Sequence, residues 1–176
     1  MERQKWTDHK FNQGIDTGWT QNILSNLKDT AIRIEHYSKS LSAKELSEKE
    51  QGKWSIKEHI GHLIDLEKLW MNRFQQFENG SLELVAADMS NTKTENANHN
   101  KTSIDQLLDS FKLERKKLIA QIQNLNMKTQ LHEAFHPRLK IMMRPVDLLS
   151  FISEHDNHHM VYIQDISGRL RTKPSF

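Results

Sequence analysis

The chain has 176 residues and no cysteine, which allows one domain over residues 1–176 and excludes disulfides, thiolate metal ligands and a catalytic thiol. The formal charge is only +2 and the basic residues are not clustered, which argues against a nucleic-acid partner. No stretch approaches the roughly 20 apolar residues of a membrane span, and residues 1–14 contain no apolar signal segment, so we expect a cytoplasmic protein without a membrane partner.

Two helices are predicted in the first half of the chain. The first covers residues 17–39, where apolar residues recur at helical spacing. The second covers residues 55–78 and has a marked beginning, because Ser55 and Glu58 form an S-x-x-E capping box. Its apolar residues form one broad face, which is typical of a helix that packs against a core.

The links of the second half are longer. Residues 81–101 are polar and irregular, and we interpret them as a crossover loop that runs the length of the molecule and is functional or partly helical. A third helix over residues 103–124 begins with another capping box. Residues 131–143 are expected to form an extended link.

The last predicted helix covers residues 145–167. It begins at Pro145, which suits the first helical position, and it is expected to end at Gly168, which can adopt a left-handed cap conformation. Four long amphipathic helices joined by one or two long crossings predict an all-α four-helix bundle.

The apolar stripe of the last helix contains two histidines, His155 and His159, one turn apart. This spacing places both imidazoles on the same face, where they can bind one metal ion. A single histidine on an apolar face is usually a core residue that bonds a backbone carbonyl, but two such residues would each need a separate partner. His158 is rotated about a quarter turn away and is less suited to the site.

The second helix supplies a third candidate ligand, either His62 or His59. Both lie on its broad apolar side, and spacing alone does not choose between them. Gly61 allows a neighbouring helix or a substrate to approach closely. Three neutral imidazoles suit zinc, nickel or another borderline ion, with manganese or iron as further candidates. They leave one coordination position open, as in catalytic sites.

These residues resemble the DinB/YfiT-like superfamily of proposed metal-dependent enzymes. The resemblance rests on Trp54-Ser55, His62-Leu63-Ile64-Asp65 and Glu67, then on His136-Pro137 and the run from Ser153 to His159. The family places its first metal histidine eight residues after the tryptophan, which implies His62 rather than His59. Its other two ligands are the outer histidines of an H-x-x-H-H run, which implies His155 and His159.

The resemblance also implies an antiparallel arrangement of the helices and a homodimer. Several members of the superfamily transfer or isomerise small molecules with a low-molecular-weight thiol such as bacillithiol or mycothiol. One position departs from the pattern, because the link after His136-Pro137 usually carries a glycine where this chain has Lys140. The departure leaves the shape of this link open.

We therefore expect a thiol-dependent S-transferase that acts on a small-molecule electrophile. The alternatives are a metal-dependent hydrolase and a non-catalytic, metal-stabilised stress-response bundle. Asp65 follows His62 by three residues and is the candidate catalytic residue, which would orient a ligand or accept a proton. The alternative for Asp65, slightly favoured over the catalytic role, is a solvated acid or an ion pair with Lys68 or Arg73.

Other side chains carry weaker expectations. Trp6 could cover the site or an interface. Arg73 and Arg115 are expected at the surface, with contact to a substrate carboxylate as the alternative. Met142 and Met143 are expected either to line a pocket or to pack in the core.

Overall fold

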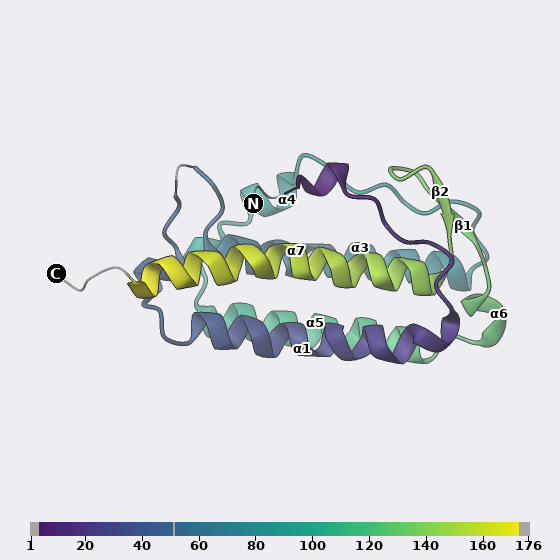
Figure 1. Ribbon diagram of the computed structural model, residues 1–176, viewed down its shortest axis with the longest axis horizontal. Helices are drawn as coiled ribbons and strands as arrows, with labels where there is room; N and C mark the ends of the chain where they lie inside the picture. The colour runs from purple at the N-terminus through teal and green to yellow at the C-terminus, as the bar shows by residue number, and fades with distance from the viewer. Residues whose placement is uncertain (1–3, 51, 173–176) are drawn as a thin grey trace.

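The computed structural model describes residues 4–50 and 52–172. Four long helices form a bundle, α1 (Thr20–Ser38), α3 (Ile56–Glu78), α5 (Ile104–Gln123) and α7 (Pro145–Thr172). In Figure 1, α3 and α7 form one layer and α1 and α5 the other. The expected all-α four-helix bundle with a long crossover is confirmed.

The direction of the helices follows from the lengths of the links. Residues 81–101 lead from the end of α3 back to the start of α5, so α3 and α5 run parallel, as do α1 and α7 (Figure 1). Within each layer the two helices are antiparallel: α3 runs against α7, and α1 runs against α5. The antiparallel pair α3 and α7 carries all the predicted metal ligands.

The helix ends are set by local chemistry. The capping boxes predicted at Ser55 and Ser103 are both present, because each hydroxyl accepts from the backbone N–H three residues on. The expected end at Gly168 is wrong, since α7 continues to Thr172. Leu170 is buried in this last turn, and its apolar contacts outweigh the roughly 1 kcal/mol that a glycine costs inside a helix.

Shorter elements occupy the links. The crossover contains α4 (Thr92–Asn96) and the 3-10 turn η3 (His99–Lys101), and the link after α5 contains α6 (Met127–Gln130) and an antiparallel hairpin of β1 (Ala134–His136) and β2 (Ile141–Met143). The chain before α1 contains the 3-10 turns η1 (Trp6–Asp8) and η2 (Thr17–Trp19), and α2 (Ala43–Leu46) precedes α3. Among the residues described, no helix is both long enough and apolar enough to cross a bilayer.

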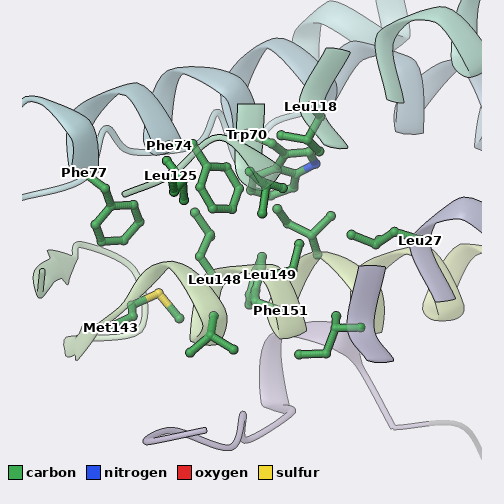
Figure 2. Packing of buried hydrophobic residues seen from close by; sticks show 14 of the residues in the cluster. Leu27, Trp70, Phe74, Phe77, Leu118, Leu125, Met143, Leu148, Leu149 and Phe151 are labelled. Carbon is green, nitrogen blue, oxygen red and sulfur yellow. The ribbon is translucent and has the colours of Figure 1, made fainter. Parts of the chain in front are cut away.

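The apolar core consists of two clusters along the bundle axis. In the first, Trp70, Phe74 and Phe77 of α3 face residues of α7 that include Leu148 and Phe151 (Figure 2). The second cluster lies toward the other end and contains Leu63, Phe111 and Met160, among others. Met143 packs in the first cluster while Met142 is exposed, so the core alternative applies to Met143 and neither methionine lines the cleft described below.

A layer of polar side chains separates the two clusters, with one residue from each long helix. Arg115 of α5 donates to Glu67 of α3 and to both carboxylate oxygens of Asp156 of α7, and Thr30 of α1 donates to Asp156 as well. All four side chains are buried. The expectation that Arg115 lies at the surface is therefore wrong, because its two carboxylate partners come from helices that are distant in sequence.

Candidate metal centre

His62 of α3 and His155 and His159 of α7 lie together where these antiparallel helices face each other. All three are buried, and one ring nitrogen from each lies within 4.8 Å of the others. The three histidines line a cleft and do not point into the bundle interior. The side of α7 that faces the interior carries Asp156, the neighbour of His155, which accepts hydrogen bonds from Thr30 of α1 and Arg115 of α5. His155 and His159 were predicted on the apolar stripe of the last helix, whereas they lie beside it and face the cleft. The three predicted histidines do come together.

The separation of His155 and His159 fits a divalent ion. The Nε2 atoms of His155 and His159 are 3.3 Å apart, which equals the ligand-to-ligand distance of about 3.3 Å in a tetrahedral site with Zn–N bonds of 2.0–2.1 Å. Nδ1 of His155 is buried without a hydrogen-bond partner among the described residues.

The trio is electrically suited to bind a cation. Burial lowers the pKa of His62 to about 4, and it lowers the pKa values of His155 and His159 well below the ordinary histidine range. All three rings are therefore neutral near pH 7, and each has a nitrogen lone pair available for a metal.

The orientation of His62 is set by a chain of hydrogen bonds. The Thr94 hydroxyl lies 3.0 Å from the Asp65 carboxylate and donates to it, so Thr94 must accept from Nδ1 of His62, 3.1 Å away. Nε2 of His62 is then the nitrogen with a lone pair. Thr94 lies on α4, within the crossover expected to be functional or partly helical, and its contact with His62 was not predicted.

Asp65 acts through this chain and does not line the cleft. Its carboxylate also accepts from Nε2 of His99 at 2.8 Å and pairs with Lys93 at 3.2 Å. These donors hold the pKa of Asp65 below its usual value despite burial. The expected ion pair with Lys68 or Arg73 is replaced by one with Lys93, and the carboxylate is linked to His62 through Thr94. The catalytic role of Asp65 stays a prediction.

His59, the competing ligand, lies behind His159. Its Nδ1 is 2.9 Å from Nδ1 of His159, and its ring stacks on Tyr162 at 5.1 Å. Burial lowers the pKa of His59 to about 3, so its neutral ring can accept a hydrogen bond from Nδ1–H of His159. This hydrogen bond leaves Nε2 of His159 directed toward His155, so His59 orients the ring of His159 without belonging to the trio.

Aromatic side chains form the walls of a cleft of about 1010 Å³ above the trio. Trp54 lies over His159, with ring centres 6.1 Å apart and nearly parallel, and its indole N–H donates to Glu95. Trp6 contacts His155 edge-on at 5.1 Å. The role of Trp6 as a cover of the site was one of two expectations, and the contact with His155 favours it over an interface.

Two arginines lie toward the other end of the cleft. Arg73 of α3 is 1% exposed and donates to the carbonyl of Val85 and to Nε2 of His136. Arg138, in the hairpin link, lies over the Phe151 ring at 5.6 Å. The expected surface position of Arg73 is wrong, and the position of Arg138 was not predicted from the sequence.

Comparison with solved structures shows the same fold in two proteins. YfiT from Bacillus subtilis, described as a probable metal-dependent hydrolase with an unusual four-helix bundle topology, aligns with a TM-score of 0.76 and 16% identity over 94% of this chain and 95% of that protein. The mycothiol-dependent maleylpyruvate isomerase aligns with a TM-score of 0.65 and 14% identity over 81% of this chain and 59% of that protein. A search of curated proteins gave no match.

A comparison with family profiles identifies the family. Residues 26–163, which include all three histidines of the trio and the polar layer, match the DinB superfamily. The chain therefore belongs to the DinB superfamily.

Proposed function

We propose that the chain is a metal-dependent enzyme in which His62, His155 and His159 hold one divalent ion, with zinc or nickel as the first candidates and manganese or iron as the others. The observation that supports this is the trio itself, three buried, neutral imidazoles that meet at the floor of an open cleft. Three protein ligands leave at least one coordination position free, and here the free side faces the cleft.

We further propose that the reaction is the transfer of a low-molecular-weight thiol to a small electrophile. When bound, the ion supplies a Lewis acid that lowers the pKa of a coordinated thiol or water. The chain has no cysteine, so the thiol has to come from a second molecule. The cleft of about 1010 Å³ is at the upper end of the roughly 300–1,000 Å³ of single-ligand pockets, which favours two small reactants.

The chain's own residues would bind and orient these reactants. Trp6, Trp54 and Phe151 provide apolar walls that bind the organic part of a substrate and exclude water. His59 and Thr94 hold the rings of His159 and His62. A metal-dependent hydrolase is the second candidate, because YfiT, which has the same fold, is described as one.

The experiment begins with metal analysis of protein purified without chelator or nickel resin. We expect about one ion per chain in the wild type and in a His36→Ala control, whose histidine lies exposed on α1, and none in a His155→Ala, His159→Ala double variant. Absence of an ion, together with unchanged thermal stability on adding zinc, nickel, manganese or iron, would contradict the proposal.

The two reactions are separated with a chromogenic aryl halide as electrophile and a panel of small thiols. Transfer predicts product only with a thiol and with the metal-loaded wild type. Turnover that needs no thiol would favour the hydrolase. If metal removal unfolds the protein and neither activity is found, the ion has a structural role and the bundle is not catalytic.

A further inference from the structure

The end of the cleft that holds Arg73 and Arg138 carries two positive charges that no acidic side chain of residues 4–50 and 52–172 pairs with. The arginines that form ion pairs within the described residues are Arg115, Arg144 and Arg169. Arg73 donates only to neutral acceptors. Nη2 of Arg138 is buried and has no hydrogen-bond partner in the described part of the chain.

The two guanidinium groups differ in what they have left to offer a ligand. Arg73 is fixed by three hydrogen bonds, two to the carbonyl of Val85 and one to His136, so it contributes mainly its charge. Arg138 is held by the face of the Phe151 ring at 5.6 Å, a contact that leaves the edge of the guanidinium free to donate. Both residues line the cleft.

Buried charge without a partner is costly, and the electrostatics of this region show the cost. Burial lowers the pKa of Arg73 to about 10, and the nearby charge of Arg138 acts in the same direction. Both side chains still remain cations at neutral pH. The free energy that a protein loses by keeping two such charges unpaired is recovered when an anion binds between them.

We propose that Arg138, assisted by the charge of Arg73, binds a carboxylate of the small molecule that occupies the cleft. The inference rests on the proposed function for the identity of that molecule as a reactant. A planar guanidinium presents two parallel N–H donors that match the two oxygens of a carboxylate. A phosphate would require more donors than this site offers, since those of Arg73 are largely in use.

The position of this subsite restricts the substrate further. Phe151, on which Arg138 lies, precedes His155 by one turn of α7, so the carboxylate binds about 6 Å along the helix from the histidine trio. The cleft therefore selects small carboxylic acids whose reacting atom lies a few bonds from the carboxylate. Either the electrophile or the thiol can supply this group.

The experiment measures binding rather than turnover, on protein as purified with its metal content determined in parallel. Phenylacetate is titrated against tryptophan fluorescence, since Trp6 and Trp70 line the cleft, and phenylacetamide and inorganic phosphate serve as probes without a carboxylate. The variant is Arg138→Met. The matched control is Arg169→Met, which removes the same charge from the same cleft but from an arginine already paired with Glu50 and Asp165.

We expect phenylacetate to bind more tightly than either comparison probe, and Arg138→Met to weaken its binding at least about 10-fold while Arg169→Met changes it less than 2-fold. Equal affinity of phenylacetate for wild type and Arg138→Met would overturn the proposal. So would loss of binding in His155→Ala alone, because the carboxylate would then sit on the metal. Tighter binding of 3-mercaptopropionate than of phenylacetate, lost in Arg138→Met, would assign the subsite to the thiol; the reverse order would assign it to the electrophile.

Discussion

His62 is oriented by Thr94, a residue from a segment whose sequence predicts little. A loop threonine in a polar run carries no signal of its own, and only the fold brings α4 over α3. By contrast, His155 and His159 were predictable because helical spacing alone places them on one face. Spacing did not distinguish His59 from His62, because both lie in the same cluster of histidines. His62 belongs to the trio, whereas His59 forms a hydrogen bond with His159.

Replacing Thr94 by valine removes the hydroxyl and keeps the shape of the side chain. We expect metal affinity to fall about 10- to 100-fold, because His62 loses the acceptor that fixes its ring. Competition with a chromophoric chelator measures the affinity. Thr94→Ser, which retains the hydroxyl, should stay close to wild type; a valine variant that binds as tightly as the serine variant would show that the hydrogen bond does not matter.

Lys140 has a φ of +57°, which explains why the family pattern usually has a glycine there. We expect Lys140→Gly to be about 1 kcal/mol more stable toward unfolding than Lys140→Ala, since alanine is strained at positive φ. Both variants lose the contact of the lysine ammonium with the Phe135 ring, so the difference isolates the backbone. Urea titration measures it, and equal stability of the two variants would disprove the strain.

At the scale of elements, the four long helices were predictable because their signals are local: capping boxes at Ser55 and Ser103, and apolar residues at helical spacing. The end of α7 was not, because Gly168 resembles a helix end locally while buried Leu170 keeps the helix going through distant contacts. The crossover was expected to be functional or partly helical and contains α4, and the link over residues 131–143 was expected to be extended and contains the hairpin. The positions of these short elements were not predicted. Their short segments gain stability from packing on α3 and α7 rather than from their own sequence.

Gly61 and Gly168 provide a matched test of element packing. A Cβ at Gly61 would lie 2.2 Å from ring atoms of His99, whereas a Cβ at Gly168 meets nothing within 4 Å. Gly168→Ala should therefore stabilise the protein by roughly 0.5–1 kcal/mol through helix propensity. Gly61→Ala should give no such gain, because it displaces His99 and deprives Asp65 of a donor.

Thermal unfolding measures the stability of both variants. Limited proteolysis measures how readily the segment containing α4 and η3 is cleaved. Faster cleavage of this segment in Gly61→Ala than in Gly168→Ala is the expected result. Equal stabilisation by both substitutions, with unchanged cleavage, would mean that His99 is not held against α3.

At the scale of the whole molecule, the buried layer of Thr30, Glu67, Arg115 and Asp156 aligns all four helices. The sequence could not reveal it, because each residue looks like an ordinary surface residue until its partners are known. One arginine faces two carboxylates, and burial raises the pKa of Glu67 to about 7. A buried polar layer of this kind favours one register of the helices over others. The homodimer stays a prediction.

The raised pKa of Glu67 makes stability depend on pH. Between about pH 4.5 and 7 the folded state binds more protons at Glu67 than the unfolded state, so the contribution of Glu67 to stability is present at low pH and is lost as pH rises. We expect the stability of Glu67→Gln relative to wild type to increase over this range by up to about 3 kcal/mol. Urea titrations at several pH values measure it. Glu83→Gln, which removes an exposed carboxylate from the crossover, should show a flat difference.

The pairing of α3 with α7 has a consequence for the biogenesis of the protein. Two of the three histidines lie on α7, which follows the other long helices along the chain. While the chain is being synthesised, α3 can present only His62, a single imidazole with little hold on any ion. Acquisition of the proposed ion would therefore wait until α7 has emerged and docked, a late step that would distinguish finished molecules from nascent ones.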